Sequence, residues 1–205
     1  GMTGGLSTQQ RSFLETIAAN IRRMSQQIRD LTDISRIETG QLRVEKAPTA
    51  FANIVSETLQ TIRGPFDEKE IELHLNLPTD LPLILADKER MVQVLTNLLS
   101  NACKYSPEKA HVHVHIYSDQ MVLAENTPPE PVVICSVKDN GYGMSEEDLA
   151  KLFTKFFRSD DPNIRKAAGT GLGLSITKGI VELHRGQLWA ESELGKGATF
   201  TFAIP

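Results

Sequence analysis

An unbroken run without proline or glycine, residues 6–39, is the feature that most constrains how this chain folds. Apolar residues recur in it at alternating steps of three and four, the spacing of a helix with one apolar stripe. Gly40 then supplies a helix stop. The pattern predicts a long helix whose stripe is covered either by its own domain or by the seam of a helical hairpin or dimer. The stripe consists of Leu14, Ile17, Ile21, Met24, Ile28 and Leu31.

From residue 41 onward, strand and helix patterns of ordinary length alternate with turns. Paired strands mixed with separate helices predict an α+β fold, in which helices cover one face of a sheet. We therefore expect two parts, the long helix at 1–40 and a globular domain at 41–205. We predict strands at 41–45, 71–76, 111–117, 132–138, 187–192 and 198–204, helices at 51–62, 87–105 and 171–184, and a surface loop at 118–131.

Composition excludes several classes of protein. The net charge of -4 gives no general attraction to nucleic acid or to anionic membranes. Cys103 and Cys135 lack a nearby partner cysteine, so we expect buried thiols rather than a zinc knuckle or a disulfide. There is no signal peptide and no apolar run long enough to span a bilayer, which predicts a cytoplasmic location. Gly1 before Met2 resembles the remnant of a cleaved tag, so we expect part of a longer protein, whose membrane attachment stays open.

The predicted helix at 87–105 has two opposed stripes. Its apolar stripe is typical of a core helix, whereas its polar stripe carries two asparagines one turn apart. A solvated face is the ordinary interpretation, but it usually carries Glu and Lys. Amide oxygens suit Mg²⁺, Lys104 adds a charge for phosphate, and Tyr105 can lie against a base. The polar stripe consists of Arg90, Gln93, Asn97, Asn101 and Lys104.

Two glycine-containing segments indicate a nucleotide. Asp139 ends an apolar strand, where its carboxylate can accept a bond from an adenine amino group, and Gly141 and Gly143 allow close approach of backbone to a flat ligand. Residues 169–174 (GTGLGL) open a helix, and amide donors at a helix N-terminus attract phosphate. No strand precedes this segment and no Gly-Lys-Ser/Thr follows it, so it is neither a dinucleotide fingerprint nor a Walker A loop.

The segment 152–158 (LFTKFFR) contains three phenylalanines, which are typical of core but also fit the hinge of a charged lid over a nucleotide. Arg158, Arg165 and Lys166 are candidate phosphate contacts on that lid. Separately, His111, His113 and His115 share one face of a predicted strand. Zinc is a minor hypothesis for them, because no acidic or cysteine partner is near in sequence.

Five motifs in this order resemble the catalytic and ATP-binding domain of sensor histidine kinases, in the GHKL ATPase superfamily. Each motif is modest alone, and their order over about 160 residues carries the resemblance. They are an N box at 97–107 (NLLSNACKYSP), glycine boxes at 139–144 and 169–174, an F box at 153–156, and a closing glycine motif at 195–200.

The resemblance implies a mixed sheet backed by helices, with ATP and Mg²⁺ between the N-box helix and a lid. Asn101 would hold Mg²⁺ with Asn97 beside it, Lys104 and Arg158 would contact phosphates, and Asp139 would read adenine with support from Thr199. Asn97, Lys104 and Arg158 would be the catalytic residues. The remaining nucleotide contacts would be Tyr105, Gly141, Gly143, Met144, Phe157, Gly169, Thr170, Gly171, Leu172, Gly173 and Leu174.

The resemblance also implies partners. The long helix resembles the second helix of the family's dimerisation and phosphotransfer hairpin, which implies a homodimer and a response regulator receiver domain as partners. None of the five histidines is followed by an acidic residue as the family's phosphoacceptor is, so we expect the acceptor helix of the same protein to lie outside this chain. Alternatives are a serine kinase of the anti-sigma type, a pseudo-kinase dimerisation module and a topoisomerase- or MutL-like ATPase. The last is disfavoured because Asn97 stands where those ATPases carry a catalytic glutamate.

Overall fold

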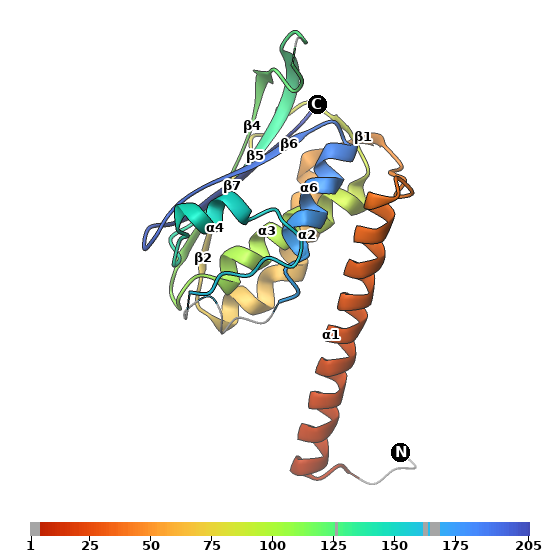
Figure 1. Cartoon of the computed structure of the whole chain (residues 1–205). Helices are drawn as coiled ribbons and strands as arrows, with labels where there is room; N and C mark the ends of the chain where they lie inside the picture. Colours follow the sequence, from red (N-terminus) through yellow and green to blue (C-terminus); the bar gives the residue numbers. More distant parts are fainter. Residues whose placement is uncertain (1–4, 126, 162–163, 165–168) are drawn as a thin grey trace.

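The computed structural model describes residues 5–125, 127–161, 164 and 169–205. The predicted long helix is α1 (Thr8–Glu38), which extends away from the rest of the molecule at its N-terminal end (Figure 1). A capping box begins it: Ser7 Oγ accepts from the Gln10 amide, and Gln10 Oε1 accepts from the Ser7 amide. These two bonds satisfy donors that the first turn would otherwise leave unpaired.

Only the last turns of α1 pack on the globular domain. Asp33 and Ile34 are buried, and Ile37 packs against Gly179, where a Cβ would lie 2.9 Å from the Ile37 side chain. The six residues of the predicted stripe are instead 50–62% exposed. The helix therefore packs on its own domain at its C-terminal end, while no described residue covers the apolar stripe toward its N-terminus.

A five-stranded sheet forms the centre of the globular domain, in the order β2-β4-β5-β7-β6. Strand β2 pairs parallel with β4 and the other neighbours are antiparallel, so the sheet is mixed as predicted. A separate two-stranded sheet pairs β1 with β3. The strands are β1 (Ala47–Thr49), β2 (Glu72–Asn76), β3 (Ile84–Ala86), β4 (His111–Met121), β5 (Glu130–Asp139), β6 (Gln187–Glu193) and β7 (Gly197–Ile204).

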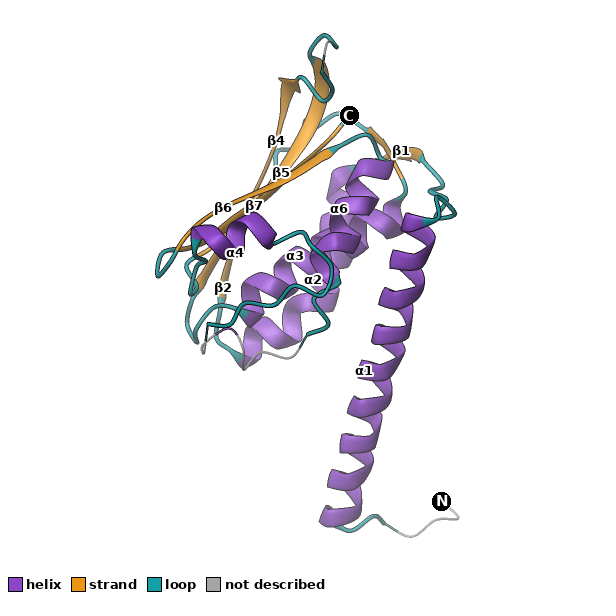
Figure 2. Ribbon diagram, in the orientation of Figure 1, coloured by secondary structure: helices purple, strands orange, loops and turns teal. Residues whose placement is uncertain are grey.

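Helices cover one face of this sheet (Figure 2). They are α2 (Phe51–Glu68), α3 (Lys88–Lys104) and α6 (Gly173–Leu183), and the short α4 (Glu146–Lys151) contacts β6. Alternation along β4 turns Val112, Val114 and Ile116 toward these helices and the intervening histidines toward solvent. The buried apolar residues of both layers form one main core. The α+β fold class is therefore confirmed.

Two sequence predictions of local structure were wrong, and one pair of short strands was missed. Residues 41–45 form no strand. The short strands β1 and β3 instead pair with each other, which we did not predict. The predicted loop at 118–131 is shorter than expected, because the β4–β5 ladder continues to the pair Met121 and Glu130. Backbone pairing needs no apolar side chains, so the polar, proline-containing sequence of this segment gave no sign that the ladder continues.

The remaining global expectations concern thiols and membranes. Cys103 and Cys135 are both buried free thiols, and burial raises the pKa of each. None of the helices in the described part of the chain combines the length and the apolar character needed to cross a bilayer.

Candidate nucleotide-binding site

A cavity of about 650 Å³ lies beside α3 and α6, at the end of β5. Its walls come from the polar stripe of α3, the residues after β5, the segment at 157–159, the start of α6 and one face of α1. Segments that are far apart in sequence therefore meet around one space. Its size suits a small-molecule ligand.

The polar stripe of α3 forms one wall. Asp87 caps this helix, since its Oδ1 accepts from the Arg90 amide at 3.2 Å. Asn97, Asn101 and Lys104 follow at helical spacing and all line the cavity. Asn97 Nδ2 donates to Thr177 Oγ1 at 2.8 Å, so this amide is held by α6.

Lys104 and Tyr105 lie together at the end of α3. Lys104 Nζ donates to the Tyr105 hydroxyl at 2.9 Å and lies 4.6 Å from the centre of its ring. A Cβ on Gly169 would lie only 2.7 Å from the same Nζ. The ammonium group thus lies between the N-box helix and the second glycine segment, where it can meet a phosphate.

Asp139 is a nearly buried carboxylate on the inner face of the sheet, with 5% of the residue exposed. Its Oδ1 accepts from the backbone amides of Gly141 at 2.9 Å and Ala198 at 3.3 Å. Burial raises the pKa of this carboxyl, and the two hydrogen bonds oppose that shift. Because both bonds end on Oδ1, the other carboxylate oxygen is available to a donor in the cavity.

Gly141 and Gly143 approach protein backbone closely, which differs from our expectation of contact with a flat ligand. A Cβ on Gly141 would lie 2.4 Å from the Tyr105 carbonyl oxygen. Gly143 has φ +66°, and its Cβ would lie 2.0 Å from the Glu193 carbonyl oxygen. The two glycines therefore pack the loop against α3 and the β6–β7 hairpin. Gly143 and Met144 line the cavity, and Gly141 does not.

The second glycine segment lies against the F-box segment. Gly171 has φ +74° and accepts a bond at its carbonyl from the Phe156 amide at 3.0 Å. Gly173 begins α6, and a Cβ there would lie 2.6 Å from Asn97 Oδ1. Leu172 is not in the cavity, because its side chain is buried in the core. The cavity is lined by Gly169, Thr170, Gly171, Gly173 and Leu174.

The three phenylalanines have different environments. Phe153 packs partly on the core, whereas Phe156 has φ +61° and is 63% exposed. Phe157 and Arg158 line the cavity. The predicted phosphate contacts Arg165 and Lys166 lie outside the described residues.

Thr199 does not lie in the cavity, which corrects its predicted support of the adenine site. Its neighbours on β7, Ala198 and Phe200, line the cavity. Because side chains alternate along a strand, Thr199 points to the other face of the sheet. The bond to Asp139 comes instead from the backbone amide of Ala198.

Residues of α1 also line the site, and sequence reasoning missed them. Gln26 and Asp30 lie in the cavity wall, and Thr170 Oγ1 donates to Asp30 Oδ2 at 3.4 Å. Nearby, Asp33 Oδ2 accepts from Arg90 Nη1 at 3.1 Å and from Gln93 Nε2 at 2.9 Å. These contacts depend on how α1 docks, for which the sequence carries no local pattern.

Comparison with known proteins decides the family. Residues 86–205, more than half of the chain, match the model of the histidine kinase-, DNA gyrase B- and HSP90-like ATPase family. The chain belongs to this family. All of the residues that we predicted to contact nucleotide lie within the matched part, and the two cavity residues of α1 lie outside it.

Among members of this ATPase family, the chain is similar to sensor histidine kinases. It is 34% identical to the circadian input-output histidine kinase CikA of Synechococcus elongatus, over 98% of this chain but 26% of CikA. The fold matches full-length ShkA in complex with AMPPNP, with a TM-score of 0.78 and 26% identity, over 98% of this chain and 40% of ShkA. It also matches histidine kinase ThkA in complex with the response regulator TrrA, with a TM-score of 0.65 and 24% identity, over 99% and 53% of the two chains. The chain therefore carries the ATP-binding domain of two-component sensor kinases, and spans about a quarter of the length of CikA.

Proposed function

We propose that this chain transfers the γ-phosphoryl group of ATP to a histidine that lies outside it, as part of a sensor histidine kinase. One observation carries the proposal: a single cavity joins a nearly buried carboxylate, the polar stripe of α3 and the glycine-rich start of α6. A nucleotide needs these three features for its base, its metal-bound phosphates and its phosphate oxygens, respectively.

At the base end of the cavity, Asp139 acts as the acceptor for the adenine amino group. Its Oδ1 is occupied by two backbone amides, so the carboxylate has a fixed orientation. Met144 and Tyr105 line the same space and supply apolar surface for the ring. Thr199 has no part in this role, since it faces away from the cavity.

At the phosphate end, Lys104 and Arg158 supply positive charge and the start of α6 supplies amide donors. The neutral amide of Asn101 is the donor type that suits Mg²⁺ in company with phosphate oxygens. Mg²⁺, when bound, neutralises charge on the transferring group. The chain's own part is to orient the phosphates and to exclude water.

The reaction is a displacement at phosphorus. An imidazole nitrogen forms a bond to the γ-phosphorus while the bond to the bridging oxygen breaks and ADP leaves. Asn97 cannot act as a base for water, because an amide does not take up a proton at neutral pH, and it is held by Thr177. The lack of a base at this position favours transfer over hydrolysis.

The acceptor is a histidine of another segment of the same protein. His184 is buried, and the other four histidines lie on β2 and β4, on the sheet face opposite the helices. None of them lines the cavity among the described residues.

We propose three partners and a location. The acceptor helix, a second copy joined through α1 and the cytoplasm follow from the motif resemblance. A response regulator receiver domain is the third partner, since ThkA forms a complex with the response regulator TrrA. We also propose that the chain divides into two parts, 1–40 and 41–205. In this division α1 forms the dimer seam and also docks on the globular domain.

Labelled ATP with Mg²⁺ tests the reaction. The chain is mixed with a separately made acceptor helix from the parent gene, and we expect label on the helix that is lost in acid and kept in base. Acid-stable label would indicate a serine kinase instead. Nucleotide binding without any label would indicate a pseudo-kinase and would contradict the proposal.

Site variants test the assignments separately. We expect Asp139→Ala and Asn101→Asp each to weaken Mg²⁺–nucleotide binding about tenfold to a hundredfold, measured by calorimetry. Asp119→Ala, an exposed carboxylate on the same sheet, is the matched control and should bind as the parent does. Unchanged binding in both site variants would show that the residue roles are wrong.

A further inference from the structure

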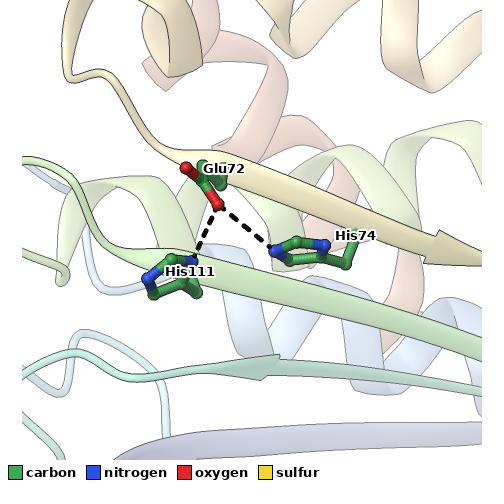
Figure 3. A group of neighbouring side chains, drawn as sticks. All are labelled: Glu72, His74 and His111. Carbon is green, nitrogen blue, oxygen red and sulfur yellow. Dashed lines mark ion pairs between the residues drawn. The ribbon is translucent and has the colours of Figure 1, made fainter.

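Two histidines and a glutamate converge on the outer face of the sheet, away from the nucleotide cavity (Figure 3). Glu72 and His74 lie on β2, and His111 lies opposite Glu72 on the parallel strand β4. Glu72 Oε2 lies 3.2 Å from His111 Nδ1 and 3.6 Å from His74 Nε2. Both imidazoles therefore point at one carboxylate oxygen.

This group supplies the acidic partner that the sequence lacked near the histidines of β4. Glu72 and His74 come from a strand far earlier in the chain, and only the parallel pairing of β2 with β4 brings them alongside. Of the three histidines that we considered as zinc ligands, His111, His113 and His115, only His111 belongs to this group. His115 turns out to bond Asn76, with 3.1 Å between its Nδ1 and the amide nitrogen.

We propose that Glu72, His74 and His111 form a binding site for Zn²⁺ or a similar divalent transition-metal ion. Ligand atoms about 2.0–2.1 Å from a tetrahedral zinc lie about 3.4 Å from one another. The two distances to the glutamate oxygen bracket that value, and the three ligand atoms all lie within 4.8 Å of one another. Small rotations of exposed side chains bring the two imidazole nitrogens to the same separation.

The chemistry of the group also fits zinc. Two imidazoles and one carboxylate are a common ligand set for this ion, with water in the remaining position. Imidazole ligands select transition metals over Mg²⁺ and Ca²⁺, which prefer oxygen. The site is therefore chemically distinct from the Mg²⁺ position that we propose at Asn101.

The surroundings hold the ligands in place while leaving the site open to solvent. The ring of His113 stacks on that of His74, with centroids 4.6 Å apart and planes at 15°. The side chains of His74 and His111 are about half exposed, so an ion can enter directly from water. Lys138, a nearby positive charge, lies on β5 opposite His113, across β4 from His74.

A bound ion would connect the edge strand β2 to the interior of the sheet. Strand β2 pairs only with β4, so its other edge has no strand beside it among the described residues. Binding to the folded state alone raises the unfolding temperature by mass action. The ion would therefore stabilise this edge strand.

Titration of the metal-free full chain with Zn²⁺, against a chromogenic chelator and without nucleotide, tests the site. We expect one ion per chain, and an unfolding temperature raised by about 5 °C at a hundredfold excess over the dissociation constant. Co²⁺ in place of zinc should give the visible absorption of a four-coordinate site.

Glu72→Gln and His74→Ala should each weaken binding about tenfold or more, because each removes a direct ligand. His115→Ala is the matched control, an exposed histidine on the same face whose loss should leave binding unchanged. All these side chains are exposed, so nucleotide binding and far-ultraviolet circular dichroism should match the parent chain. Absence of stoichiometric binding, or equal loss in His115→Ala, would overturn the proposal.

Discussion

Helices α1 and α3 are both amphipathic, but they differ in what covers the apolar stripe. The stripe of α3 is fully buried between α2, α6 and the sheet, with Met91 and Leu98 completely inaccessible. The stripe of α1 is half exposed or more over most of its length. The comparison shows that periodicity identifies a helix and its apolar face, while only the rest of the assembly decides whether that face is covered.

The polar faces of the two helices also differ. That of α3 contributes to the cavity over its C-terminal half, because Asn97, Asn101 and Lys104 all line it. That of α1 contributes only near its docked end, where Asp30 and Asp33 bond the domain. The two helices meet at Asp33, Arg90 and Gln93, so the docked end of α1 is anchored on the very helix that carries the site.

Shortening one apolar side chain in each stripe should give the largest difference between the two helices. We expect Leu98→Ala on α3 to lower the free energy of unfolding by about 3 kcal/mol, because it leaves a cavity in a closed core. Ile17→Ala on α1 should change it by less than about 0.5 kcal/mol, since the side chain is exposed. Urea unfolding of both variants at low protein concentration provides the measurement. Similar losses would show that the stripe of α1 is covered within the chain.

The junction between the helices should give the next largest effect. Arg90→Ala removes one of two donors to the nearly buried Asp33 carboxylate, and we expect a loss of about 1–2 kcal/mol. Amide exchange should speed up in the last turns of α1. Lys155→Ala, which breaks the exposed ion pair with Glu38, is the matched control and should cost less than about 1 kcal/mol. An equal loss in the control would show that α1 is not held at Asp33.

The smallest of the three effects is a dependence on pH at the start of α3. His184 Nε2 accepts from the Asp87 amide at 3.0 Å, and its Nδ1 donates to the Ile180 carbonyl at 2.8 Å, so the buried ring is neutral. Burial lowers the pKa of this imidazole below its ordinary 6.5; the Ile180 carbonyl raises it in part, Lys46 adds to the lowering, and Asp87 opposes it. The side-chain bonds at the start of α1, by contrast, join Ser7 and Gln10, neither of which is titratable.

The sign of the effect follows from proton uptake. Above pH 6.5 the imidazole is neutral in both states and the full stability is present. Below pH 6.5 the unfolded chain takes up a proton that the folded chain resists, so the free energy of unfolding falls until pH drops below the lowered pKa. Urea unfolding at pH 7.5 and 5.5 should show this loss in the parent chain and a smaller one in His184→Gln. Equal losses would mean that other groups cause it.

Much of the fold could be predicted because its helices are periodic and some of them carry clear end signals. Asp87 and Gly40 mark ends that the structure reproduces within two residues. The errors at β1, β3 and the β4–β5 extension share a cause, because these segments are fixed by pairing with distant strands rather than by their own side-chain pattern.

For the candidate site, sequence reasoning identified the motifs but misjudged some side chains within them. Leu172 and Thr199 lie in the right segments but point elsewhere, into the core and to the opposite face of the sheet. Asp30, Thr177 and Glu72 escaped notice because their neighbours in space come from remote parts of the chain. Residue spacing identifies which segment takes part, and tertiary packing decides which atoms do.

The bond between Thr170 and Asp30 makes α1 part of the wall that encloses the nucleotide cavity. A displacement of α1 that removes this wall changes the affinity for nucleotide by some factor. Reciprocity of coupled equilibria then requires that bound nucleotide shift the docking equilibrium of α1 by the same factor. A spectroscopic label on α1 would therefore report nucleotide occupancy, and nucleotide affinity would in turn measure any force applied to the N-terminal end of the helix.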